Sequence, residues 1–181
     1  MALDERCRER ASYRALLARL WGLYAPLEDV LGGIDWGDAD VGIADRSKLR
    51  WLEGDLVDLG QAEGTLADLP RATLSPMIND RIDALGALYV VEGASLGGQL
   101  ISRRLTADLG VTAARGGRFF ASYGNQVGVR WRDYLSVLER FADQPAAAAR
   151  IEASALATFD SFLAWFGAER PGADLMSEAS Q

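Results

Sequence analysis

Apolar residues recur at helical spacing along five stretches of the chain, and no stretch alternates as a strand would. In the first stretch, for example, Tyr13, Leu16 and Leu20 fall on one face of a helix. The pattern predicts an all-α fold, a single-domain multi-helical bundle. The predicted helices cover residues 12–31, 47–59, 80–109, 126–142 and 145–166.

Capping residues and glycines mark where the predicted helices begin and end. Ser12 is expected to cap the first helix and Asn79 the third, because their side chains accept hydrogen bonds from free backbone N–H groups. Gly110 is expected to end the third helix. Pro26 lies inside the first helix and predicts a kink near Gly22, whose carbonyl loses its intrahelical donor.

No linker or internal repeat divides the chain. Residues 1–167 are therefore expected to form one domain, followed by a flexible tail over residues 168–181. Within the domain, Leu85 and Tyr89 are expected to share the apolar face of the third helix. Residues 116–120 are expected to form a loop before the fourth helix.

The composition narrows the range of partners. The 181 residues carry a net charge of −7, which argues against nucleic acid as a partner because phosphate binding requires a basic surface. No apolar run reaches the roughly 18 residues of a membrane span, and the charged residues 1–10 do not resemble a signal peptide. A single cysteine, Cys7, suits the reducing cytoplasm.

The chain contains no histidine. This absence removes the usual general base near neutral pH and the most common nitrogen ligand for metals. It excludes catalysis by serine–histidine and cysteine–histidine pairs. It also excludes di-iron sites built on Glu-x-x-His.

Four glycines, Gly86, Gly93, Gly97 and Gly98, lie inside the third predicted helix. Each interior glycine costs about 0.8–1.0 kcal/mol relative to alanine, so a bare backbone is expected to serve a purpose there. One purpose is close helix packing, with Gly93 and Gly97 as a small-x-x-x-small pair. The other is a flat ligand lying against the helix, and the pattern alone does not choose between them.

The glycines belong to a segment that resembles a known family. Residues 85–99 read LGALYVVEGASLGGQ and resemble the glycine-rich distal helix of heme oxygenases, most closely the bacterial, biliverdin-producing type associated with phytochromes. In that family this helix bends over the heme. The resemblance therefore implies a heme oxygenase-like helical fold with a bend between Gly93 and Gly98.

Two further motifs support the resemblance. Residues 20–28 (LWGLYAPLE) are similar to the family's second helix, and residues 118–124 (RFFASYG) are similar to the loop after the distal helix. The sequence also departs from the family. The family's heme-ligating histidine lies on a preceding helix, which is expected to be missing here, and Ala94 stands where the mammalian pattern has an aspartate.

The resemblance implies a set of heme-binding residues. Arg132 is expected near a heme propionate, because the family places a basic residue there. Cys7 is an alternative thiolate ligand for the iron, although an exposed, non-ligating position is also compatible with the sequence. The expected heme-binding residues are Gly93, Ser95, Gly97, Gly98, Arg132 and Phe159.

The resemblance implies a reaction in which heme is both cofactor and substrate. Oxidative cleavage of heme yields biliverdin, carbon monoxide and ferrous iron, and it requires electrons from a small redox protein or a reductase. Without histidine the activity is open. The alternative is a non-catalytic module of the same fold that binds heme, a bilin or a protein partner.

Overall fold

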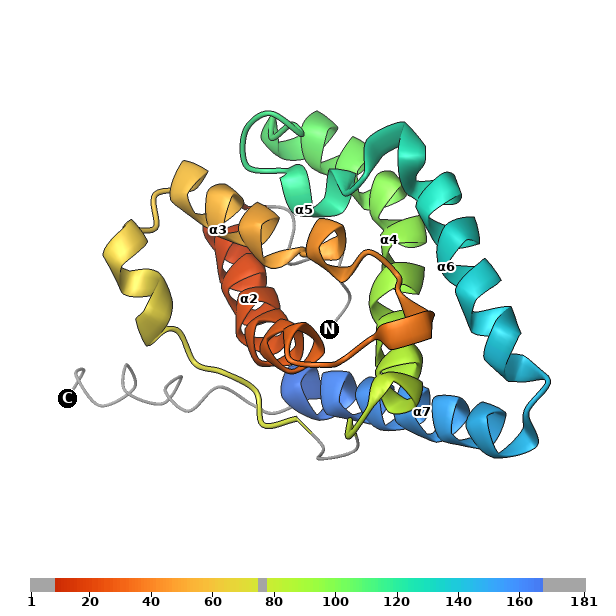
Figure 1. Ribbon diagram of the computed structural model, residues 1–181. Coiled ribbons are helices and arrows are strands. Elements are labelled where there is room, and N and C mark those ends of the chain that lie inside the picture. Colours follow the sequence, from red (N-terminus) through yellow and green to blue (C-terminus); the bar gives the residue numbers. More distant parts are fainter. Residues whose placement is uncertain (1–8, 75–77, 168–181) are drawn as a thin grey trace.

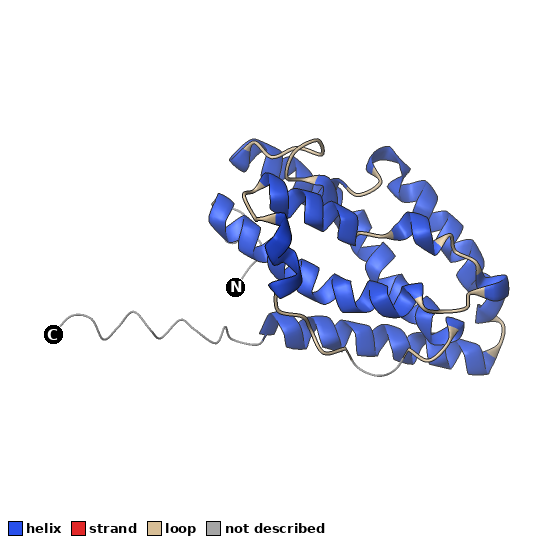
Figure 2. Cartoon of the chain, turned by 60° about the vertical axis from the view of Figure 1, so that its left-hand side comes forward, coloured by secondary structure: helices blue, strands red, loops and turns tan. Residues whose placement is uncertain are grey.

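The computed structural model describes residues 9–74 and 78–167. In these residues the chain forms six α-helices and four short 3-10 helices, with no strand (Figure 2). The all-α prediction is therefore confirmed. The expected tail over residues 168–181 and the possible ligand Cys7 lie outside the described residues.

The helices form a bundle around α4 (Figure 1). α4 packs against α7, α5 and α6, whereas α2 packs mainly against α3. The α-helices are α2 (Arg10–Gly32), α3 (Leu49–Asp58), α4 (Arg81–Leu109), α5 (Arg118–Ala121), α6 (Val127–Ala142) and α7 (Pro145–Gly167). The 3-10 helices are η1 (Gly37–Ala39), η2 (Ile43–Arg46), η3 (Glu63–Asp68) and η4 (Gly124–Gln126).

α2 begins two residues before the predicted cap. Ser12 lies inside the helix, and Glu9 precedes it without a capping side chain. The prediction is wrong because a tertiary contact extends the helix: the Arg10 guanidinium donates to the Leu109 carbonyl at 3.2 Å. At Pro26 the helix continues unbroken.

The α2 carbonyl that Pro26 leaves without a donor is used by another segment. The Ala72 N–H donates to the Gly22 carbonyl at 2.8 Å. Because a proline removes one intrahelical hydrogen bond, this contact satisfies the carbonyl of Gly22. It also attaches the segment before α4 to the middle of α2.

The start of α4 is capped by Asp80 rather than by Asn79. The Asp80 carboxylate accepts hydrogen bonds from the N–H groups of Ile82 and Asp83, and it pairs with Arg150 of α7 at 2.7 Å. A charged acceptor is favoured at a helix N-terminus by the helix dipole, which explains why the aspartate takes the cap. At the other end, Gly110 has φ +65°, as its predicted role requires.

The first half of α4 packs closely on α7, and Gly86 makes this approach possible. A Cβ on Gly86 would lie 2.2 Å from the Ile151 carbonyl oxygen. Leu85 on this half of the helix is fully buried, whereas Tyr89 is 40% exposed. Tyr89 therefore does not share the buried face as predicted; its ring contacts Trp131 of α6 instead.

The central part of α4 curves without losing its helical hydrogen bonding. The helix is continuous from Arg81 to Leu109, and in Figure 1 its green ribbon changes direction so that its second half leans towards α3. No irregular turn interrupts the glycine cluster between Gly93 and Gly98. The end of this half contacts the start of α2, where the Arg10 guanidinium donates to the Leu109 carbonyl.

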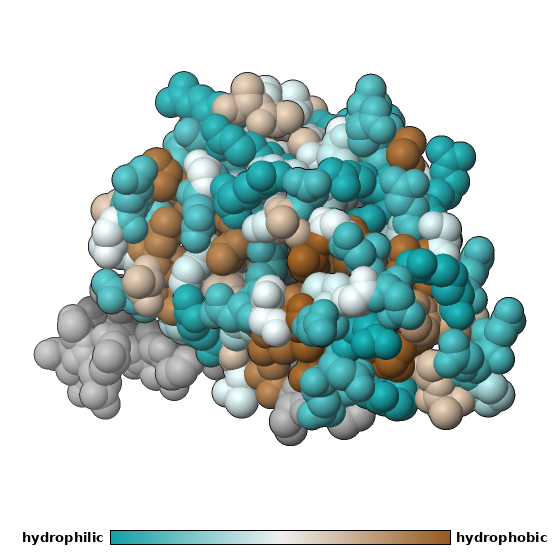
Figure 3. All heavy atoms as spheres, viewed as in Figure 1, coloured by the Kyte–Doolittle hydropathy of each residue, from teal (hydrophilic) through white to brown (hydrophobic). Residues whose placement is uncertain are grey.

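The face of the molecule drawn in Figure 3 is mainly hydrophilic. On the face shown in Figure 3, hydrophobic residues are visible in hollows between hydrophilic ones. By length and composition α4 would also pass as a membrane-spanning helix, but half of its most apolar window is buried inside the fold. A core helix of a bundle has the same character.

We predict that Gly86→Ala lowers the free energy of unfolding by about 1–3 kcal/mol, because the new methyl group must displace the α7 backbone. Gly128→Ala is the matched control, since a Cβ there meets no atom within 4 Å. That control should gain about 0.4–1 kcal/mol. Urea denaturation followed by circular dichroism measures both. Equal stability of the two variants would contradict the close packing of α4 on α7.

Candidate functional site

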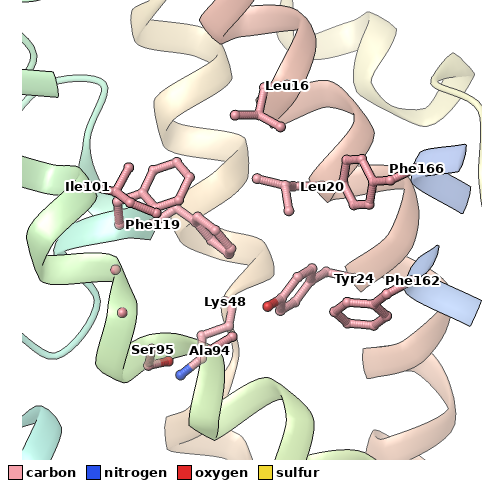
Figure 4. Close-up of a pocket in the computed structure, with 13 residues that line it drawn as sticks. Leu16, Leu20, Tyr24, Lys48, Ala94, Ser95, Ile101, Phe119, Phe162 and Phe166 are labelled. Carbon is pink, nitrogen blue, oxygen red and sulfur yellow. The ribbon is translucent and has the colours of Figure 1, made fainter. Parts of the chain in front are cut away.

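A cavity of about 470 Å³ lies between α2, α4, α5 and α7 (Figure 4). Its volume falls within the roughly 300–1,000 Å³ typical of small-molecule sites. Most of its wall is apolar, and its few polar side chains gather towards one end. The apolar wall is formed mainly by Leu16 and Leu20 of α2, Ile101 of α4, Phe119 of α5, and Phe162 and Phe166 of α7.

The adjacent glycines Gly97 and Gly98 both line the cavity, but they meet different surroundings. A Cβ on Gly97 would meet no atom within 4 Å, so this glycine leaves open space. A Cβ on Gly98 would lie 2.8 Å from the Phe120 carbonyl oxygen. Gly98 therefore allows α5 to approach α4, while Gly97 presents bare backbone to the cavity.

The short helix α5 holds Phe119 and Phe120 in the cavity wall. Asp55 of α3 is fully buried and accepts hydrogen bonds from the N–H groups of Arg118 and Phe119 at 2.9 and 2.8 Å. Burial raises the pKa of the Asp55 carboxyl, and these hydrogen bonds act against the rise. Residues 118–120 of the segment expected to be a loop are thus helical, because a buried carboxylate caps their free N–H groups.

The C-terminal part of α7 is fixed to α2 by a reciprocal contact. The Trp165 indole N–H donates to the Arg19 carbonyl at 2.8 Å, and the Arg19 guanidinium donates to the Trp165 carbonyl. The same guanidinium lies 5.1 Å from the centroid of the Phe166 ring. These contacts hold the Phe162 and Phe166 rings against the cavity.

The polar end of the cavity is formed by Tyr24, Ser95 and Lys48 (Figure 4). Tyr24 is 2% exposed, and its hydroxyl has no hydrogen-bond partner in the part of the chain that the structure describes. Burial raises the pKa of this hydroxyl, and the nearby carboxylates of Glu28 and Glu92 raise it further. The group therefore stays protonated and is available as a donor to a ligand.

Lys48, the only lysine in the chain, is held by a buried carboxylate. Its amine lies 2.9 Å from Glu92 Oε1 and also donates to the Tyr123 hydroxyl. The other Glu92 oxygen accepts from Arg46 at 2.6 Å. One carboxylate thus faces two cations, all three groups being nearly inaccessible to solvent.

Burial lowers the pKa of the Lys48 amine to about 8, and the attraction of Glu92 acts against this shift. The backbone at Lys48 is fixed by a second carboxylate. Glu28 Oε1 accepts from the N–H groups of Lys48 and Leu49 at 2.6 and 3.0 Å, which caps α3. The two glutamates of the LWGLYAPLE and LYVVEG segments therefore hold the residues at the end of the cavity.

Three of the sequence-predicted residues meet at the cavity and three do not. Ser95, Gly97 and Gly98 line it, whereas Gly93, Arg132 and Phe159 do not. Arg132 is exposed and donates to the Gly128 carbonyl of its own helix. Phe159 is 50% exposed on the outer face of α7, and a Cβ on Gly93 would make only ordinary contact with Trp131.

Sequence reasoning missed Lys48 and Tyr24 as residues of the site. Lys48 precedes Leu52 and Leu56 by one and two helical turns, so it lies in register with the apolar stripe of α3. A single lysine in register with buried leucines is an unusual position for a charge. That spacing was the signal available in the sequence.

The two adjacent glycines should respond oppositely to alanine. Gly97→Ala should raise the free energy of unfolding by about 0.4–1 kcal/mol, because the methyl group enters open space and alanine restricts the unfolded chain. Gly98→Ala should lower it by about 1–3 kcal/mol, because the methyl group meets the Phe120 carbonyl. Thermal and urea denaturation measure both. A loss of stability in Gly97→Ala would assign Gly97 to helix packing.

The stability of the fold should rise with pH between about 8 and 10 because of Lys48. Its folded pKa of about 8 lies below its ordinary value of 10.5, so in this window the unfolded chain binds more protons and stability increases with pH. The expected gain relative to Lys48→Met is of order 1–3 kcal/mol. Urea denaturation of both proteins at several pH values measures the difference. If the free energy of unfolding changes with pH in the same way in both proteins, the lowered pKa of Lys48 is contradicted.

Comparison with known proteins identifies the family of the chain. In the described part of the chain no cluster of three or more cysteine, aspartate or glutamate side chains is arranged to bind a metal ion. A search of curated proteins finds no match to the chain. The family model described as heme oxygenase matches residues 3–168, which include every helix that lines the cavity. The chain therefore belongs to the heme oxygenase family.

Proposed function

We propose that the cavity binds heme as a substrate and that the chain cleaves it oxidatively to biliverdin, carbon monoxide and ferrous iron. The observation that carries the proposal is Gly97, where the α4 backbone borders open space in an otherwise apolar cavity. A flat macrocycle can lie against the wall at Gly97, because no side chain projects from the backbone there. Membership of the heme oxygenase family supports the same ligand.

The residues at the cavity would hold heme in two ways. The rings of Phe119, Phe162 and Phe166 offer apolar contact for the macrocycle. The hydroxyls of Tyr24 and Ser95 offer hydrogen bonds. Bound heme supplies the redox chemistry by which oxygen and electrons open its own ring, and a small redox protein or reductase supplies the electrons.

The iron ligand distinguishes the two candidate functions. The chain has no histidine, and burial raises the pKa of Tyr24, which disfavours a phenolate ligand. The Lys48 amine is engaged by Glu92. This set of groups favours, as a second candidate, a non-catalytic module that binds heme or a bilin by apolar contact and hydrogen bonds.

Hemin titration tests the proposed site, with the Soret band as the readout. Gly97→Leu should weaken binding at least roughly tenfold, or about 1.4 kcal/mol, because the side chain fills the space next to α4. Gly128→Leu on α6 is the matched control, since its Cβ also meets no atom within 4 Å but lies away from the cavity. That control should bind hemin like the wild type.

The same samples separate catalysis from binding alone. Incubation with hemin, oxygen and an electron donor should release biliverdin, which absorbs at longer wavelength than heme. If the wild type binds hemin, Gly97→Leu weakens that binding, and no biliverdin forms, the results would instead support the non-catalytic module. Unchanged binding in Gly97→Leu, or none in the wild type, would contradict the proposed site.

A further inference from the structure

The amine of Lys48 combines three features that are rare in one lysine. It belongs to the only lysine of the chain, it lines an apolar cavity, and its side chain is 2% exposed. In Figure 4 it lies at the Ala94 and Ser95 end of the cavity, with the Tyr24 hydroxyl on the cavity side of it. Lysines in such surroundings serve as nucleophiles towards carbonyl compounds.

We propose that Lys48 captures an apolar aldehyde in the cavity as an imine. The proposal concerns covalent binding by the side chain and does not depend on heme binding. The ligand class follows from the cavity: aromatic rings line its length, so the body of the aldehyde is apolar and flat. Its carbonyl group lies at the polar end, which Tyr24 and Lys48 line.

The charge balance around Lys48 permits its amine to become neutral. Glu92 faces both Lys48 and Arg46. When Lys48 loses its proton, Arg46 still pairs with Glu92 at 2.6 Å, so no buried charge is left without a partner. Burial lowers the pKa of Lys48 to about 8, although Glu92 and Glu28 act in the other direction.

The residues around Lys48 suit each step of imine formation. Lys48 reacts as its neutral amine, whose hydrogen bond to Glu92 Oε1 at 2.9 Å orients it while Glu92 stays ionised and paired with Arg46. The free amine attacks the carbonyl carbon and forms the C–N bond, while the Tyr24 hydroxyl donates a hydrogen bond to the carbonyl oxygen. The attacking nitrogen passes its two protons to the oxygen, the C–O bond breaks, and the oxygen leaves as water. One amine and one aldehyde give one imine and one water, and no oxidant or reductant takes part.

Reductive trapping with 2-naphthaldehyde tests the proposal. The full chain is incubated at pH 8 and reduced with borohydride, and the adducts are located by peptide mass spectrometry. Only Lys48 and the α-amino group of Met1 are expected to react, so Met1 is an internal reference. Lys48 in the folded chain should react at least as extensively as Met1.

Unfolding in urea should reverse this order. At pH 8 the change of the Lys48 pKa from about 8 to 10.5 reduces the neutral amine roughly a hundredfold. The Lys48 adduct should therefore fall at least tenfold relative to that of Met1. If Lys48 reacts only after unfolding, or not at all while Met1 reacts, the proposal is wrong.

Two comparisons show whether the cavity directs the reaction. Gly97→Leu should reduce the Lys48 adduct at least fivefold while leaving the Met1 adduct unchanged, whereas Gly128→Leu should change neither. The charged probe 4-formylbenzenesulfonate should label Met1 but not Lys48. Equal labelling of Lys48 by both probes, or in both variants, would show an exposed amine and overturn the proposal.

A Tyr24→Phe variant tests the role assigned to the hydroxyl. It should form the same imine several-fold more slowly, because it lacks only the donor to the carbonyl oxygen. An unchanged rate of imine formation would show that the Tyr24 hydroxyl takes no part in the reaction. Circular dichroism verifies that each variant is folded. The hemin titration is a separate measurement, so failure of either proposal is visible without the other.

Discussion

The buried carboxylate of Glu92 is the interaction on which the end of the cavity depends. It joins α4 to Arg46 and Lys48, which lie on the connection between α2 and α3, and it accepts a hydrogen bond from Tyr123. A buried ion without a partner would cost several kcal/mol. The long connection after α2 is therefore held against α4 by electrostatics as well as by apolar packing.

Two further carboxylates fix the segments that border the cavity. Glu28 fixes the backbone of Lys48 from α2, and Glu92 fixes its amine from α4. Asp55 performs a comparable task on the other side by capping α5. Three buried or half-buried carboxylates thus position segments that would otherwise be loops, and the aromatic wall follows from their geometry.

The sequence predicted the helices well because their apolar stripes are regular. It also singled out the glycines of α4, but the four have different functions. Gly86 and Gly98 permit backbone contacts with other helices, Gly97 borders the cavity, and Gly93 does neither. Helical periodicity predicts which face of α4 each glycine occupies. Whether a glycine packs against another helix or borders the cavity depends on which backbone lies opposite that face, and the periodicity does not show this.

The errors at individual residues have similar origins. Ser12 and Asn79 were reasonable caps by local chemistry, but α2 begins before Ser12, where Arg10 contacts Leu109, and the charged Asp80 caps α4 in place of Asn79. Arg132 and Phe159 were expected to bind heme by resemblance, and the structure places both on the surface, outside the residues that line the cavity. Lys48 was missed because charged residues usually lie on the surface. Its spacing of four residues from Leu52 nevertheless predicts the same, buried face of the helix.

The polar groups of the cavity come from three elements that converge at one end. Ala94 of α4 offers no hydrogen-bonding group, and the Ser95 hydroxyl is turned to the Val91 carbonyl at 3.4 Å. Tyr24 reaches this end from α2, whereas Lys48, just before α3, extends its amine to Glu92 of α4. Away from this end, the bare backbone at Gly97 borders open space. The proposed ligand would therefore lie with its polar edge at the converging groups and its apolar body along Gly97, where a missing side chain leaves room for it.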